Sequence, residues 1–192
     1  MDKLKRFAEE NFIPIVRDET AKILMEECKK NSPQNILEIG TAIGYSGILM
    51  LKSCNGHLYT IEKDISRYEI AKENFVKYGM SERVTLMLGD AKEQLEILKS
   101  HNYKFDFVFL DGPKGQYIKY LPTIKSLLNK NAILFSDNVL MHGLINHQEE
   151  VTHKNRAMVR NMKAFNDEIM NDKDFDSKFY EIDDGFIVSR KL

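Results

Sequence analysis

The chain has 192 residues, with 28 Lys and Arg against 29 Asp and Glu, and 43% of its residues are hydrophobic. These values fit one globular domain, predicted as residues 1–192 with a helical cap over residues 1–32, and the near-zero net charge indicates no class of partner. No apolar run reaches the length of a membrane span, and the charged start MDKLKRFAEE is not a signal peptide. Cys28 and Cys54 fit neither a metal-binding spacing nor a disulfide framework, which favours a cytoplasmic protein.

Short β-rich runs alternate with amphipathic patterns along most of the chain. Near the start, Asp18 is expected to cap a helix, and further on Asp64 is expected to cap another helix that ends before Gly79. The predicted strands are Asn35–Ile39, Leu58–Ile61, Val84–Leu88, Phe105–Leu110 and Ala132–Ser136. The predicted helices are Glu19–Lys29, Tyr45–Lys52, Ser66–Tyr78, Ala91–Ser100 and Ile118–Leu128.

The pattern changes after the fifth predicted strand. Met158–Met170 has helical spacing, and Lys178–Ile182 and Phe186–Arg190 flank the sequence DDG, a hairpin signal. Apolar strands that alternate with helices predict an α/β fold, with a parallel sheet covered by helices on both faces. The hairpin predicts an antiparallel pair at the edge of that sheet.

The stretch EIGTAIGYS at residues 38–46 lies where the first predicted strand turns into a helix, and ligands bind there in such sheets. Gly40 allows a tight turn, and Gly44 allows a ligand or the next helix to approach closely. Glu62 ends the second strand, where a carboxylate can bind ribose hydroxyls. Glu38 would repel a pyrophosphate, and GTAIG departs from the dinucleotide fingerprint, which disfavours a nicotinamide-dependent oxidoreductase. S-adenosylmethionine, which carries a sulfonium, an amino group and a ribose but no phosphate, fits better.

Polar residues follow two further buried strands. Asp111 lies in FLDGPKG, and Asp137 and Asn138 lie in FSDNVL. Two carboxylates and one amide at neighbouring strand ends are hard ligands that suit Mg²⁺, and Lys114 stands one turn from Asp111. The alternative is that these residues only begin turns. Their coincidence beside the cofactor motif favours the metal site.

These motifs resemble the class I S-adenosylmethionine-dependent O-methyltransferases, the group that includes catechol O-methyltransferase and the caffeoyl-CoA enzymes. The resemblance implies a Rossmann-like sheet of seven strands, mostly parallel with an antiparallel last strand. It implies that Asp111, Asp137 and Asn138 bind the divalent metal and that Lys114, beside Asp111, is the catalytic base. A metal of this kind requires an acceptor hydroxyl next to a second oxygen.

A run of cations follows the second metal motif. Arg156, Arg160 and Lys163 recur at the spacing of one helix face and could bind phosphates. The alternative is a solvated face, since no aromatic residues alternate with the charges in the manner of RNA-binding surfaces. His142 and His147, in the loop before this run, are expected to be solvated rather than bound to substrate.

Several longer stretches resemble the bacterial tRNA 5-hydroxyuridine methyltransferases, namely AEENFIPI, LEIGTAIGYSGILM, DNVLMHGL, KNRAMVRNMKAFN and DGFIVSRK. This resemblance implies a homodimer that lacks an N-terminal segment of that group and methylates 5-hydroxyuridine at the tRNA wobble position, giving 5-methoxyuridine. It also implies a weak substrate contact by Arg17. A small catechol or caffeoyl-CoA-like acceptor and a non-catalytic nucleoside-binding module are the alternatives. The cofactor residues that the resemblances imply are Val16, Glu38, Gly40, Gly44, Ser46, Glu62, Asp90, Ala91 and Asp111.

Overall fold

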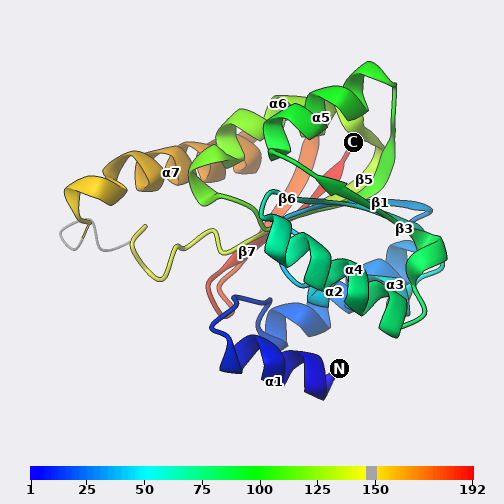
Figure 1. Ribbon diagram of the computed structural model, residues 1–192. Coiled ribbons are helices and arrows are strands. Elements are labelled where there is room, and N and C mark those ends of the chain that lie inside the picture. Colours follow the sequence, from blue (N-terminus) through cyan, green and yellow to red (C-terminus); the bar gives the residue numbers. More distant parts are fainter. Residues whose placement is uncertain (146–150) are drawn as a thin grey trace. The chain divides into compact units, whose positions relative to one another are not determined.

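A computed structural model describes residues 1–145 and 151–192, and the chain divides into two compact units, Met1–Gln94 and Leu95–Leu192 (Figure 1). The first unit contains α1 (Asp2–Glu10), α2 (Asp18–Asn31), β1 (Asn35–Ile39), α3 (Tyr45–Ser53), β2 (His57–Glu62), α4 (Ile65–Lys77), η1 (Ser81–Arg83), β3 (Val84–Leu88) and the start of α5 (Ala91–Ser100). The second unit contains the rest of α5, then β4 (Phe105–Leu110), η2 (Lys114–Gln116), α6 (Tyr117–Leu127), β5 (Leu128–Asp137), η4 (His153–Asn155), α7 (Arg156–Asn171), β6 (Phe175–Tyr180) and β7 (Phe186–Lys191).

The strands form a seven-stranded sheet in the order β3-β2-β1-β4-β5-β7-β6. In the first unit, β1 and β3 both pair in parallel with β2. In the second unit, β4 pairs in parallel with β5, whereas β7 is antiparallel to both β5 and β6. The predicted fold class, a mostly parallel Rossmann-like sheet with an antiparallel last strand, is confirmed.

Most predicted boundaries agree with the structure, and the exceptions have local causes. Asp64 caps α4, because its carboxylate accepts hydrogen bonds from the backbone N–H groups of Ser66 and Arg67. The predicted cap at Asp18 is wrong. Asp18 is the first residue of α2, and its carboxylate instead accepts a hydrogen bond from Lys5 at 2.6 Å.

Two predicted strands begin too late. The fifth strand begins at Leu128 rather than Ala132, and the sixth begins at Phe175 rather than Lys178. In both cases exposed polar residues in the first half of the strand break the apolar pattern on which the prediction depends.

The central strands are apolar along their length because both of their faces are covered. In the first unit, Ile36, Leu37 and Ile39 of β1 are fully buried, and α2 packs against α3. In the second unit the rings of Phe109 and Phe135 meet edge to face, with their centroids 5.7 Å apart. The polar residues at the ends of these strands are therefore held on a rigid base.

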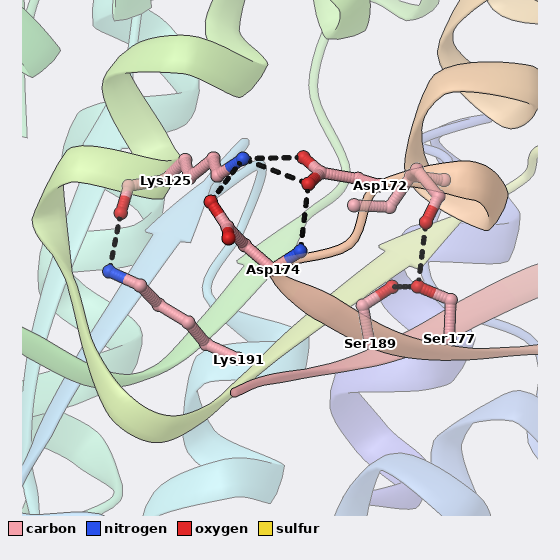
Figure 2. A network of polar contacts seen from close by, with 7 residues as sticks. Lys125, Asp172, Asp174, Ser177, Ser189 and Lys191 are labelled. Atoms are coloured by element: carbon pink, nitrogen blue, oxygen red, sulfur yellow. Dashed lines mark hydrogen bonds and ion pairs between the residues drawn. The ribbon is translucent and has the colours of Figure 1, made fainter.

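A polar network joins the last turns of α6 and α7 to the final strands of the second unit (Figure 2). Lys125 donates to both carboxylate oxygens of Asp172, at 2.9 and 2.7 Å, and lies 2.7 Å from Asp174. Lys191 donates to the carbonyl oxygen of Lys125 at 3.0 Å. Burial alone would raise the pKa of Asp172, but the hydrogen bonds from Lys125 and the backbone of Asp174 lower it.

We expect Lys125→Met to lower the free energy of unfolding by about 1–2 kcal/mol at pH 7, because two carboxylates lose their cation. Since the pKa of Asp172 is depressed in the folded state, this stabilisation is present at neutral pH and is lost as the pH falls through the depressed value. Urea titrations at pH 7 and pH 3 measure both effects. Lys130→Met, at an exposed position of β5, is the matched control. An equal loss at both pH values would contradict the expectation.

Candidate active site

The glycine-rich turn after β1 has the backbone shape that the sequence predicts. Gly40 and Gly44 have φ angles of 103° and 82°, and Ala42 between them has a φ of 48°. Gly44 is the N-cap of α3, and a Cβ atom there would lie 3.1 Å from the ring of Phe75. The turn therefore brings the N-terminus of α3 close behind the end of β1, with free backbone N–H groups at the helix start.

Glu62 ties this turn to the end of β2. Its Oε2 atom accepts a hydrogen bond from the Ala42 backbone N–H at 2.8 Å. Its Oε1 atom accepts from the backbone N–H groups of Lys63, at 2.9 Å, and Asp64, at 2.8 Å. The carboxylate is buried apart from a 7% exposed fraction, and each oxygen can still accept a further bond from a ligand hydroxyl.

Glu38 is fully buried beneath the same turn. It accepts hydrogen bonds from the hydroxyls of Ser46, on α3, and Thr60, on β2, the second at 2.6 Å. Thr60 also lies 2.6 Å from the hydroxyl of Thr41 in the turn. Glu38 thus joins three segments of the first unit, a positioning role that the sequence did not predict.

The remaining predicted cofactor residues of the first unit lie in separate elements. Asp90 precedes α5 and pairs with Lys63 at 3.1 Å, a hydrogen bond that lowers the pKa of Asp90. Ala91 begins α5 and is buried, Val16 is buried before α2, and Arg17 is exposed beside it. All the predicted cofactor residues except Asp111 lie within Met1–Gln94.

The second unit contains the predicted base and metal ligands. Lys114, at the start of η2, donates to the Asp111 carboxylate at 2.6 Å and to the Tyr117 hydroxyl at 3.0 Å. That hydroxyl lies 2.9 Å from the carbonyl oxygen of Leu110 and 3.2 Å from that of Asp137, to which it can donate. Tyr117 therefore holds the lysine against the ends of β4 and β5. From the sequence, Tyr117 could stack a base or, the favoured alternative, pack its helix against the sheet, and its contact with Lys114 was not predicted.

The charges in this group are strongly coupled. Burial, together with the negative charge of Asp111, raises the pKa of Asp137 to about 7, while Lys114 works to lower it. Burial alone would lower the pKa of Lys114, but Tyr117 and Asp111 outweigh this effect and raise it. Lys114 is therefore an ammonium ion at neutral pH in this arrangement, whereas Asp137 is only partly ionised at that pH.

The predicted metal ligands follow paired positions of two parallel strands. Leu110 of β4 is opposite Ser136 of β5, so the next residues lie side by side at this edge of the sheet. Asp111 follows β4, and Asp137 is the last residue of β5, where it pairs with Phe186 of β7. Asn138 follows in a left-handed conformation with a φ of 55°, and its N–H donates to Asp137 at 2.7 Å. Within residues 1–145 and 151–192, no group of three or more His, Cys, Asp and Glu could hold a metal. Two carboxylates with one amide oxygen remain a donor set that fits Mg²⁺.

The predicted basic residues lie on α7 and line one cavity of about 300 Å³, together with Val151 and Val159. The cations are Arg156, Arg160 and Lys163, and none of them has an ion pair within the described part of the chain. The buried face of α7 packs on η2, where Asn161 donates to the carbonyl oxygen of Gly115 at 2.9 Å. The cavity and Lys114 are thus carried by two elements in direct contact.

The loop after Asp137 contains one of the two histidines that the sequence marked. His142 is exposed, and its Nδ1 atom lies 3.5 Å from the buried carboxylate of Asp184. His147 lies outside the described residues. Asp184 itself was not predicted, because an acid within a hairpin signal gives no indication of burial.

The strand order, the antiparallel pair at the sheet edge and the acids around a turn without a dinucleotide fingerprint are together those of a methyltransferase domain. The sequence model of the family described as O-methyltransferase matches residues 1–192, which is the whole chain. This protein belongs to the O-methyltransferase family. Family membership agrees with the sequence-based argument against a nicotinamide-dependent oxidoreductase.

Several known proteins resemble the chain. A catechol O-methyltransferase from Niastella koreensis is 31% identical over 115 residues, which cover 58% of this chain and 52% of that relative. The crystal structure of a candidate caffeoyl-CoA O-methyltransferase from Staphylococcus aureus has a TM-score of 0.92 and 33% identity, covering 100% of this chain and 91% of the other. TomG, an O-methyltransferase from Streptomyces achromogenes involved in tomaymycin synthesis, was crystallised with S-adenosylmethionine. It gives a TM-score of 0.86 at 25% identity, covering 96% of this chain and 86% of TomG.

The chain spans only about half, 52%, of the length of the catechol O-methyltransferase that it matches. The acceptor and partners of that relative are therefore not assigned to this chain. Among residues 1–145 and 151–192, no helix combines the length and apolar character needed to cross a bilayer. The single domain with its helical cap, the homodimer and the cytoplasmic location stay predictions.

We expect Thr60→Val to lower the free energy of unfolding by about 2–3 kcal/mol, because the buried Glu38 carboxylate loses a hydrogen bond. Thr85→Val, on the neighbouring strand β3, is the matched control. Its hydroxyl contacts His57 in an exposed position, so its loss should cost within about 0.5 kcal/mol. Urea denaturation of both variants makes the comparison, and equal losses would show that Glu38 does not depend on Thr60.

Proposed function

We propose that this protein transfers the methyl group of S-adenosylmethionine to a hydroxyl that has a second oxygen beside it, with the help of a divalent cation. The observation that carries the proposal is the Lys114–Asp111 pair, which Tyr117 fastens to the ends of β4 and β5 in a chain of the O-methyltransferase family. Once neutral, the amine of a lysine placed in this way can accept a proton at a defined point.

The cofactor is proposed to bind at the glycine-rich turn of the first unit. Glu62 is fixed by three backbone N–H groups, so its remaining lone pairs have a defined direction for a ribose diol. The negative charge of Glu38 beneath the turn suits a cationic ligand. The bound S-adenosylmethionine of TomG supports this choice of cofactor.

The donor set of the second unit supports a divalent cation held by Asp111, Asp137 and Asn138. The buried Asp137 has a pKa raised to about 7 by burial and by Asp111, so a nearby positive charge would favour its ionised form. When bound, such a cation would lower the pKa of an acceptor hydroxyl and favour acceptors with two adjacent oxygens.

Lys114 is proposed to be the general base, with Asp111 controlling its protonation. To accept a proton the lysine must be neutral, and in the present arrangement Tyr117 and the Asp111 carboxylate hold it as an ammonium ion. Lys114 becomes a base once that carboxylate is engaged elsewhere and the ammonium group has released its proton to solvent, since burial of the side chain favours the neutral amine. Tyr117 then keeps the amine in place, and this fixed position is its contribution to the rate.

We propose 5-hydroxyuridine in the tRNA wobble position as the acceptor, since its O4 and O5 atoms are adjacent. The cavity on α7 supports an acceptor with phosphates, because three cations line it on a helix packed against the Lys114 segment. A small catechol or caffeoyl-CoA-like acceptor is the second candidate, favoured by the names of the relatives.

Replacing Lys114 with Ala should reduce the rate of methyl transfer by about 10²–10⁴-fold, because the proton acceptor is lost. The affinity for S-adenosylmethionine should not change, since the cofactor residues of the first unit are untouched. Single-turnover transfer and calorimetry measure the two quantities. Lys119→Ala, an exposed lysine of α6, is the control, and full activity of the Lys114 variant would remove this residue from the mechanism.

The acceptor is tested by comparing methyl transfer to tRNA that contains 5-hydroxyuridine, to catechol and to caffeoyl-CoA. We expect the tRNA to react, and the double variant Arg156→Ala/Arg160→Ala to bind it more weakly. For this variant, the slope of log affinity for tRNA against log salt concentration should be less steep. The decrease should be about one for each phosphate that the variant no longer neutralises. Lys173→Ala, an exposed cation outside the cavity, is the control.

Two results would contradict the tRNA acceptor. One is a tRNA reaction that does not respond to salt. The other is unchanged 5-methoxyuridine, without accumulated 5-hydroxyuridine, in the tRNA of cells that lack the gene. Faster reaction with catechol or caffeoyl-CoA would support the second candidate.

A further inference from the structure

The segment that follows the proposed metal ligands has an unfavourable backbone. Asn138, Met141 and His142 have φ angles of 55°, 53° and 55°, and none of them is glycine. Each left-handed residue of this kind carries an energetic cost, which is smaller for asparagine. Such a backbone persists only where its surroundings hold it in place.

The β6–β7 hairpin supplies that support through its turn. The backbone N–H of Val139 donates to the carbonyl oxygen of Gly185 at 2.9 Å, and that of Leu140 donates to the carbonyl oxygen of Asp184 at 3.0 Å. The packing is close, since a Cβ atom on Gly185 would lie 2.6 Å from Leu140. The loop after Asp137 and the turn of the β6–β7 hairpin are therefore held together by these contacts.

The third bond comes from a side chain. The buried carboxylate of Asp184 accepts a hydrogen bond from the backbone N–H of His142, and its other oxygen faces the His142 ring at 3.5 Å. Asp184 is the acid of the hairpin turn that reaches the strained residues directly. Asp183, next to it, is exposed.

We propose that Asp184 is a positioning residue for the cation site, which holds the loop so that the backbone N–H of Asn138 stays bonded to the Asp137 carboxylate. The inference rests on the proposed function, because it concerns the cation assigned to Asp111, Asp137 and Asn138. Asp184 is not proposed as a ligand, since both of its oxygens face His142. Its positioning effect acts through the backbone of residues 138–142, while its charge also helps to raise the pKa of Asp137.

The test uses Mn²⁺ as the probe and measures its dissociation constant by electron paramagnetic resonance in the full chain. Asp184→Ala should weaken Mn²⁺ binding by about 10–100-fold, the usual cost of losing a residue that orients metal ligands. Asp184→Asn keeps an oxygen that can accept the His142 N–H, so it should restore most of the affinity. Affinity for S-adenosylmethionine should be unchanged in both variants.

Asp176→Ala, at an exposed position of β6, is the matched control and should bind Mn²⁺ as the natural chain does. Unchanged Mn²⁺ affinity in Asp184→Ala would overturn the inference. Asp184→Asn as weak as Asp184→Ala would also overturn it, because the hydrogen bond would then not be what matters. This second variant decides the question if Asp184→Ala does not fold. Absence of Mn²⁺ binding by the natural chain would instead overturn the proposed cation, and this inference with it.

Discussion

The second unit depends on one interaction, the ion pair between Lys114 and Asp111, and on the tyrosine that fixes it. The buried Asp137 and the half-buried Asp111 repel each other at adjacent strand ends, and one lysine relieves that repulsion. Tyr117 holds the lysine while it bridges the carbonyl oxygens at the ends of β4 and β5. The geometry and the charge of this group therefore cannot be changed independently of each other.

Strand periodicity and turn chemistry were sufficient to predict the sheet. The positions of Asp111 and Asp137 followed from the rule that polar residues after buried strands gather at one edge, and the register of Leu110 with Ser136 agrees with it. Lys114 was found by its spacing from Asp111. The sequence could not show that the fifth strand begins before Ala132, because the residues there are mostly polar and partly exposed to solvent.

The residues that sequence reasoning missed act through contacts between distant segments. Glu38 was predicted as a cofactor residue, and that stays a prediction, whereas its hydrogen bonds from the hydroxyls of Ser46 and Thr60 were missed. Asp184 lies more than forty residues along the chain from the loop that it holds, as the separation of 42 positions from His142 shows. Such partners carry no periodic signal and no local motif, so they become visible only in the folded chain.

The two faces of helix α7 make different contacts, and this difference has an evolutionary consequence. Its inner side is anchored by Asn161 to the segment that carries Lys114, while its outer side presents cations around a cavity. Under the proposed function, substitutions on the outer side would change which acceptors bind and leave the segment of the general base in place. Natural selection could then diversify what such a scaffold modifies while its reaction chemistry stays the same.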